Sequence, residues 1–186
     1  KDEKPAIATL QTLEISDIEL VSANCKAKIT DDGNSEITQR GICWATNSQP
    51  TTSDFSTSNG TGLGEYSGKM SGLVPDTKYY VRAYATNSVG TAYGNVIDFT
   101  TKTITVPLVT ILTPNGITQK IANSGGSVTN DGGAAIIARG VCWSTKTNPS
   151  LSDNKTVNGS GTGSFESNIS GLIPNTTYYI KAYATN

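Results

Sequence analysis

The chain has 186 residues, a formal net charge of −1 at neutral pH and 16% charged residues. This near-neutral balance, with no basic run, excludes a typical nucleic-acid partner, because nucleic-acid binding needs clustered Lys and Arg to displace counterions. The sequence holds no histidine, which removes the commonest general base and the commonest metal ligand from any candidate site.

The first five residues, Lys-Asp-Glu-Lys-Pro, are charged and end at a proline. Such a start fits a mature N-terminus or the end of a tether, and a signal peptide or lipidated leader removed earlier would leave the same start. No stretch of the sequence approaches the roughly 18–20 apolar residues of a membrane span. We therefore expect no membrane insertion of this chain.

Alternation of apolar and polar residues dominates the sequence, and its 19 glycines crowd with Ser, Thr and Asn between the alternating runs. This pattern is typical of short antiparallel strands joined by tight turns. A turn at residues 31–34 and a looser segment, Asn47–Asn59, with a short strand of its own, interrupt the longer runs. In chain order the expected longer strands are Ala6–Glu14, Glu19–Thr30, Ile37–Thr46, Leu63–Ser71, Lys78–Asn87 and Thr91–Thr101.

Two of these strands indicate which face lies in the core. Ile42 and Trp44 share one face of the third strand, and the small residues Ala83 and Ala85 share one face of the fifth. A tryptophan needs the space that two alanines leave across a core, and exposing it would forfeit apolar burial worth a few kcal/mol. We therefore expect Ile42 and Trp44 to point inward.

The second half of the sequence repeats the first. Arg40–Trp44 returns as Arg139–Trp143 and Gly72–Tyr80 returns as Gly171–Tyr179, both at an offset of 99 residues, and about half of the aligned positions are identical. This period is too long for a solenoid repeat, so each copy is a module with its own core. We expect modules over residues 1–102 and 103–186, joined without a flexible Gly/Ser linker as a fairly stiff tandem.

The second copy stops at Asn186, where its fifth strand ends, so the sequence lacks a counterpart of Ser88–Thr101. Without that last strand, Tyr178–Thr185 would present unpaired backbone groups along one edge, which native sheets rarely leave bare. We expect either that residues beyond Asn186 complete the sheet, or that a strand of another chain docks at this edge by β-augmentation. The second outcome would make the chain a subunit of a surface polymer formed by strand donation.

The string LVPDTKY over residues 73–79, followed by apolar alternation and by N-x-x-G at residues 87–90, resembles the region around the sixth strand of fibronectin type III domains. In that family a tyrosine at the position of Tyr79 and Tyr178 closes the core while its hydroxyl bonds upstream backbone. The resemblance implies an all-β chain of two tandem immunoglobulin/fibronectin III-like antiparallel β-sandwiches, the second without its last strand. Together with the alternation and the repeat, it indicates structural core roles for Trp44, Trp143, Tyr79, Tyr178, Leu73 and Leu172.

Further strings look like a bacterial subgroup of these repeats: R-G-(I/V)-C-W, G-x-G-x-G at residues 60–64 and Y-A-T-N at residues 84–87. Such repeats occur in surface lipoproteins and large extracellular proteins of Gram-negative anaerobes. The resemblance therefore implies an extracellular or outer-membrane location, with a lipid anchor attached through a removed N-terminal leader. Other surface proteins or glycans are the partners that it implies.

One candidate binding surface follows from the alternation of the fifth strand in each copy. The residues opposite the core form an outward aromatic and cationic stripe, which could stack against a sugar or a partner side chain. The alternative is structural, because such residues often cover one another through cation–π contacts on a solvated sheet face. The six residues are Tyr80, Arg82, Tyr84, Tyr179, Lys181 and Tyr183.

Other motifs favour structural roles. The glycine runs at residues 60–64 and 159–163 lack the preceding strand and following helix of a phosphate cradle, so they indicate turns or bulges. Asp31 and Asp32 lack the ligand spacing of a calcium loop and fit turns. Cys25, Cys43 and Cys142 have no histidine to activate them, so we expect buried free thiols rather than nucleophiles or a bridge. We expect no catalytic residue, no metal and no cofactor.

The leading functional hypothesis is therefore a non-catalytic extracellular module pair that acts in adhesion or as a spacer. The first alternative is a carbohydrate-binding accessory module that uses the outward tyrosines. The second is the polymer subunit formed by strand donation.

Overall fold

A computed structural model describes residues 4–186, and every regular element in that range is a β-strand. All strand pairs within that range are antiparallel. The chain divides into two compact units, Lys1–Thr103 and Ile104–Asn186. The division falls one residue after the expected module boundary.

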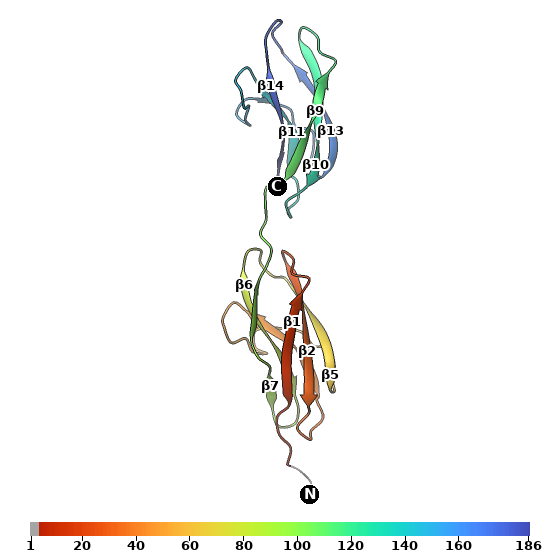
Figure 1. The fold of residues 1–186 in the computed structure, drawn as a ribbon, viewed down its shortest axis with the longest axis vertical. Coiled ribbons are helices and arrows are strands. Elements are labelled where there is room, and N and C mark those ends of the chain that lie inside the picture. Colours follow the sequence, from red (N-terminus) through yellow and green to blue (C-terminus); the bar gives the residue numbers. More distant parts are fainter. Residues whose placement is uncertain (1–3) are drawn as a thin grey trace. The chain divides into compact units, whose positions relative to one another are not determined.

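The first unit is a sandwich of two sheets, one of which runs β1-β2-β5 side by side (Figure 1). These strands are β1 at Thr9–Ser16, β2 at Ser22–Asp31 and β5 at Gly64–Ser71. The other sheet has the order β4-β3-β6-β7, and β8 also pairs with β6. Its strands are β4 (Phe55–Ser56), β3 (Gln39–Ala45), β6 (Lys78–Thr86), β7 (Thr91–Tyr93) and β8 (Ile97–Thr100).

The core of the first unit lies between the two sheets. Ile42 and Trp44 of β3 are buried in it, on the face that the alternation predicted. The alanines of β6 lie beside them in the same sheet and not across the core, as the size argument expected, because β3 pairs with β6 and Ile42 pairs with Ala83. Leu73 and Tyr79 are buried in the same cluster. Phe99 of β8 stacks on Tyr79 with ring centroids 5.9 Å apart, so the last strand closes this side of the core.

Tyr79 also ties the turn before β6 to the core, as the family resemblance implied. Its hydroxyl accepts a hydrogen bond from the backbone N–H of Val74 at 3.1 Å. The second unit repeats this bond, because the hydroxyl of Tyr178 accepts from the N–H of Ile173 at 3.2 Å. Each tyrosine therefore holds the loop that precedes its own strand.

The expected single strand Thr91–Thr101 is wrong, because residues 94–96 separate β7 from β8. Thr12 of β1 lies under this break. Its N–H and hydroxyl donate to the side-chain and backbone oxygens of Asn95 at 3.1 and 2.6 Å, and its hydroxyl accepts from the N–H of Ala83 at 2.9 Å. The buried hydroxyl of Thr12 thus takes the place of a backbone partner in the sheet, and the strand is interrupted at residues 94–96.

The first two strands begin later than the alternation predicted, at Thr9 and Ser22 instead of residues 6 and 19. Asp17 adopts a positive φ of 48°, and the N–H of Glu19 donates to the carbonyl of Ser22 at 2.8 Å. This turn uses residues 17–21 to reverse the chain. The apolar residues in this turn pack at the edge of the core, but they do not pair with a neighbouring strand.

The second unit repeats this architecture with sheets of order β13-β10-β9 and β12-β11-β14. Its strands are β9 (Leu108–Asn115), β10 (Ile121–Asn130), β11 (Ala138–Ser144), β12 (Asn154–Lys155), β13 (Gly163–Ser170) and β14 (Tyr179–Thr185). Figure 1 shows β14 beside β11. Within the described residues β14 pairs only with β11 and ends its sheet, where β6 of the first unit has β7 and β8 as further neighbours.

The core of the second unit is accordingly less covered. Trp143 and Phe165 are buried in it, but Leu172, Tyr178 and Ile180 are only partly buried. Their counterparts in the first unit, which include Leu73 and Tyr79, are buried. The predicted fold class is confirmed: the chain is all-β, with two tandem fibronectin III-like antiparallel sandwiches, the second without its last strand.

Candidate functional site

The predicted aromatic and cationic stripe does not form a free surface in the first unit. Tyr84 was expected to point into solvent, but only 2% of it is exposed. Its hydroxyl donates to the carbonyl of Thr57 at 2.7 Å, because the segment between β3 and β5 folds across the outer face of the sheet. The prediction that Tyr84 is available to a ligand is therefore wrong.

The two other stripe residues of the first unit are half-buried and contact neighbouring side chains. The guanidinium of Arg82 lies 4.0 Å from the ring centroid of Tyr93, and its Nε donates to the carbonyl of Pro50. The Nζ of Lys78 lies 5.1 Å from the ring centroid of Tyr80. These are the cation–π contacts by which outer-face side chains cover one another.

The stripe of the second unit is more open but partly engaged as well. The hydroxyl of Tyr183 donates to the carbonyl of Thr156 at 2.6 Å, and the Nζ of Lys181 donates to Oδ1 of Asn148 at 2.6 Å. Tyr179 is 42% exposed, which makes it the most accessible aromatic ring of the predicted set. The structure therefore does not bring the six residues together as one binding face.

The repeated string Arg-Gly-x-Cys-Trp lies in β3 and β11. Its glycine leaves room for the segment that covers the outer face of the sheet in each unit. A Cβ on Gly41 would lie 2.0 Å from the carbonyl oxygen of Thr57, and one on Gly140 would lie 2.2 Å from that of Thr156. Cys43 is buried beneath the same segment. The sequence reasoning missed this covering, although small residues at outward strand positions were a signal for it.

The arginine of the same string binds the glycine runs. Nη1 of Arg40 donates to the carbonyl oxygens of Gly62 and Leu63 at 3.0 and 2.9 Å. Arg139 makes the equivalent bonds in the second unit. Carbonyl oxygens that converge on a guanidinium have the wrong polarity for an anion, which needs N–H donors. The runs therefore act as turns bound to an internal cation, as the turn interpretation predicted.

The acidic loops form side-chain turns. Oδ1 of Asp31 accepts from the N–H of Gly33 at 2.7 Å, and Oδ1 of Asp32 accepts from the N–H of Asn34 at 3.0 Å. Asn130 makes the equivalent bond in the second unit. Over residues 4–186, no three His, Cys, Asp or Glu side chains lie close enough together to hold a metal ion.

The three thiols are unpaired and buried. Burial is the main cause that raises the pKa of Cys25 to about 12, with a smaller contribution from Cys43, and burial raises the pKa of Cys43 itself to about 11. Burial also raises the pKa of Cys142. Since the thiolate is the nucleophile and the metal ligand, burial and raised pKa values argue against either role for these three thiols.

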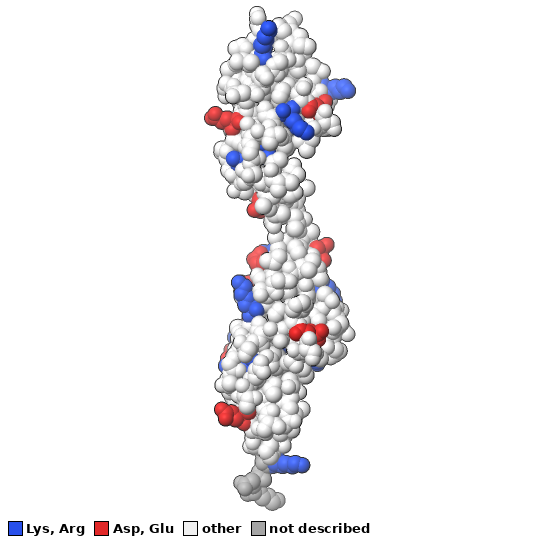
Figure 2. Space-filling model, turned by 180° about the vertical axis from the view of Figure 1, so that it is seen from behind, with Lys and Arg blue, Asp and Glu red and all other residues white. Residues whose placement is uncertain are grey.

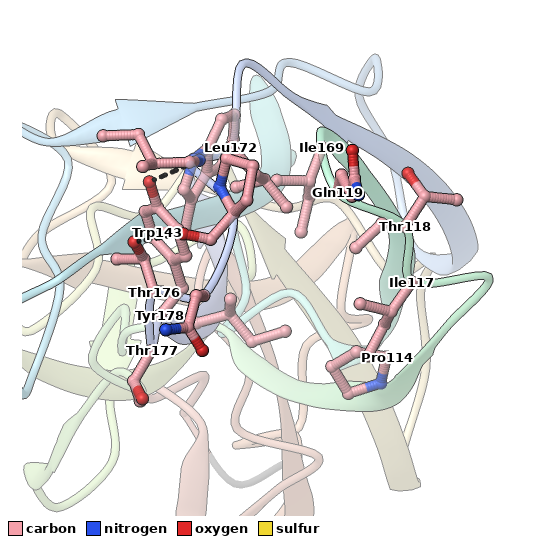
Figure 3. Close-up of a pocket in the computed structure, with 15 residues that line it drawn as sticks. Pro114, Ile117, Thr118, Gln119, Trp143, Ile169, Leu172, Thr176, Thr177 and Tyr178 are labelled. Carbon is pink, nitrogen blue, oxygen red and sulfur yellow. Dashed lines mark hydrogen bonds between the residues drawn. The ribbon is translucent and has the colours of Figure 1, made fainter.

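A groove of about 630 Å³ opens beside β14 in the second unit. Pro114 at the end of β9 and Ile117 in the turn after it lie across the groove from Trp143 and Tyr178 (Figure 3). Ile117 is 71% exposed. The groove thus combines apolar side chains with polar ones such as Gln119 and Thr176, and it lies beside β14, which within residues 4–186 pairs only with β11.

Charged side chains show no comparable concentration. On the face drawn in Figure 2, basic and acidic residues lie singly or in small groups. Four ion pairs occur among the described residues, all between exposed side chains, and such pairs contribute little to stability. In the part of the chain that the structure describes, no helix is long and apolar enough to cross a membrane.

Comparisons with known proteins add the following. No protein-family model and no curated protein matches the chain. A sensor domain of the anti-sigma factor RsgI4 from Pseudobacteroides cellulosolvens is similar at 14% identity over 54% of this chain and 99% of that chain, with a TM-score of 0.39. A segment of two fibronectin type III domains from chicken tenascin is similar at 12% identity over 95% of this chain and 94% of that chain, with a TM-score of 0.37.

Proposed function

We propose that the chain is a non-catalytic pair of β-sandwich modules that serves at a bacterial cell surface as a spacer or in adhesion. One observation supports this best: side chains on the outer sheet faces are engaged by the module's own covering segment. Tyr84 and Tyr183 donate their hydroxyls to that segment, and Arg82 donates to its backbone. Side chains used in this way stabilise a module and are not free for a substrate.

The chemistry of the buried groups supports the non-catalytic part of the proposal. A nucleophilic cysteine needs a lowered pKa and an accessible position, whereas Cys25, Cys43 and Cys142 are buried with raised pKa values. The arginines with the most contacts, Arg40 and Arg139, bind backbone carbonyls. Turnover of a glycan, peptide or phosphate ester by the purified chain would overturn this part of the proposal.

A glycan array and polysaccharide-retarded gels separate the spacer from the carbohydrate-binding alternative. Tyr179→Ala is the informative variant because Tyr179 is exposed and its loss should leave the fold intact. Val157→Ala, at a position 68% exposed, is the matched control. We expect no retention of the parent chain. Retention that is lost in Tyr179→Ala and kept in Val157→Ala would favour the carbohydrate-binding accessory.

The proposed location at the cell surface, with a lipid anchor, calls for a separate test on the full-length protein in cells. We expect protease added to intact cells to degrade the modules, and radiolabelled fatty acid to label the full-length protein. Modules that resist protease until the cells are lysed would contradict the surface location. Absence of fatty-acid label would contradict the anchor alone.

A further inference from the structure

The sequence contains three Asn-Gly pairs, at residues 59–60, 115–116 and 158–159. Asparagine before glycine is the dipeptide most prone to spontaneous deamidation, because glycine has no side chain to hinder attack by its own backbone nitrogen. The reaction also needs an asparagine side chain that is free to bring its carbonyl carbon to that nitrogen. The three pairs therefore differ in reactivity according to how firmly the fold holds each asparagine.

Asn59 is fixed by hydrogen bonds at its side chain and at its backbone. Its Oδ1 accepts from the hydroxyl of Thr57 at 2.5 Å, and its Nδ2 donates to the carbonyl of Ser67 at 2.9 Å. Its N–H donates to the carbonyl of Arg40 at 2.8 Å, and the carbonyl of Gly60 accepts from the N–H of Arg40 at 2.9 Å. Attack by the Gly60 nitrogen would require the side-chain bonds to break.

Asn158 is held in the same way in the second unit. Its Oδ1 accepts from the hydroxyls of Thr156 and Ser167, both at 2.6 Å, and its Nδ2 donates to the carbonyl of Glu166 at 2.6 Å. Its N–H donates to the carbonyl of Arg139 at 2.7 Å. The segment that covers the outer sheet face of each unit therefore also holds its asparagine in place.

Asn115 has no such restraint. It is the last residue of β9 and is exposed, and over residues 4–186 its side chain makes no hydrogen bond. Gly116 adopts a positive φ of 57°, and its N–H has no acceptor among the same residues. The carbon and the nitrogen that must join are therefore both unengaged.

The exposure of Asn115 does not depend on how its sheet is completed. Its counterpart in the first unit, Ser16, is exposed although β8 packs on the core of that unit. The turn has a similar backbone shape there, because Asp17, at the position of Gly116, has a φ of 48°. A unit in which β8 is in place therefore leaves this turn open to solvent.

We propose that Asn115 is a site of spontaneous deamidation in the folded chain. Hydroxide removes the proton from the Gly116 nitrogen, which attacks Cγ of Asn115. The new N–Cγ bond closes a succinimide while the Cγ–Nδ2 bond breaks, and the leaving nitrogen takes a proton from water and departs as ammonia. A second water opens the ring at either carbonyl, which gives aspartate or isoaspartate. This inference goes beyond the proposed spacer role and does not depend on it, because it concerns the chain's own chemistry.

Each event adds one negative charge at neutral pH to the turn between β9 and β10. Isoaspartate also adds a carbon to the backbone at the position where Asn115 pairs with Asn123. The first unit shows that a carboxylate fits beside this turn, since Asp17 accepts from Nδ2 of Asn24, the counterpart of Asn123, at 2.7 Å. We therefore expect the modified chain to stay folded, with the pairing of β9 weakened only at its end.

Peptide mapping by mass spectrometry tests the proposal on the whole chain, incubated at pH 8 in water enriched in heavy oxygen. The product should carry the mass of an NH group replaced by one heavy oxygen. We expect Asn115 to convert at least about tenfold faster than Asn59 and Asn158, since breaking their side-chain bonds adds about 1.4 kcal/mol or more to the barrier. In guanidinium chloride, where these bonds are lost, the three rates should agree within about threefold.

Two variants locate the reaction. Gly116→Asp introduces the residue of the first unit's turn, where a φ of 48° shows that a side chain is tolerated, and should slow conversion at residue 115 by about tenfold because the added side chain hinders the nitrogen. Thr113→Ala, at an exposed position of the same strand, is the control and should leave the rate unchanged. Circular dichroism checks that both variants fold.

Three results would overturn the proposal. They are equal rates at the three asparagines in the native chain, an unmodified Asn115 under conditions that convert the unfolded chain, and an unchanged rate in Gly116→Asp. Persistence of the native ranking in guanidinium chloride would also overturn it, because the neighbouring sequence and not the fold would then set the rates.

Discussion

Replacing Trp44 by alanine should remove a large part of the first unit's stability. Trp44 is 5% exposed, lies in the core between the two sheets and stacks on Phe55 with ring centroids 6.0 Å apart. Large-to-small changes of this kind in packed cores cost about 3–5 kcal/mol. Since small domains have only about 5–15 kcal/mol of stability, we expect the first unit of Trp44→Ala to unfold at much lower denaturant.

The second unit provides a matched comparison. Trp143 is 8% exposed, but it also lines the open groove, so part of the space left by truncation is already in contact with solvent. We therefore expect Trp143→Ala to cost about 3 kcal/mol, at the low end of the same range. The stability difference between the two variants measures how much the last strand contributes to closing the first core.

Urea denaturation followed by far-UV circular dichroism gives the unfolding free energy of each variant from the transition midpoint and slope. The chain has two tryptophans, one in each unit, so the remaining one reports the unmutated unit by fluorescence and serves as an internal control. That control transition should not move. A loss below about 1 kcal/mol in Trp44→Ala, typical of surface substitutions, would refute the packing argument for β3.

Three further outcomes follow from the geometry. Gly41→Ala should cost about 3 kcal/mol, because its Cβ would meet backbone at 2.0 Å; the exposed Ser67→Ala is the control, and equal denaturation midpoints would contradict the close approach. Tyr79→Phe should cost about 1 kcal/mol by leaving one backbone N–H without its acceptor, and an unchanged midpoint would count against that bond. Burial raises the pKa of the Cys25 thiol from 9.0 to about 12 in the folded state. The folded state therefore keeps this thiol protonated where the unfolded chain loses the proton, so the free energy of unfolding is unaffected below pH 9 and falls as pH rises toward 12. Cys25→Ala should flatten that alkaline decline in the first unit, and native thiol labelling should be slow at pH 8; rapid labelling would show that the thiols are accessible.

Strand positions and core faces could be predicted because side chains alternate across a sheet with a fixed period of two. The inward face of Ile42 and Trp44 could be predicted in this way, but the position of the alanines of β6 could not, because the pairing of β3 with β6 places them in the same sheet. The break between β7 and β8 could not be predicted in this way, because it depends on a hydroxyl of Thr12, which is more than 80 residues away from Asn95 in sequence.

The binding surface could not be predicted because exposure depends on the path of an irregular segment. Alternation places Tyr84 on the outer face of its strand, but residues 46–62 cross that face and bury it. Similarly, the missing strand predicted an open edge at β14. It did not predict that Ile117 and Trp143 would line a groove next to that edge, since these residues come from a turn and from another strand.

The backbone amides of Thr57 and Thr156 test the central claim most directly, namely that each module's own segment covers the outer face of its sheet. The N–H of Thr57 donates to the carbonyl of Ile42, and the N–H of Thr156 donates to the carbonyl of Val141, both at 2.9 Å. Amide hydrogen exchange of the native chain, read residue by residue by NMR, separates local opening from global unfolding. We expect both amides to exchange about as slowly as the core of their own unit. Exchange at these two positions as fast as in an exposed loop would contradict the account.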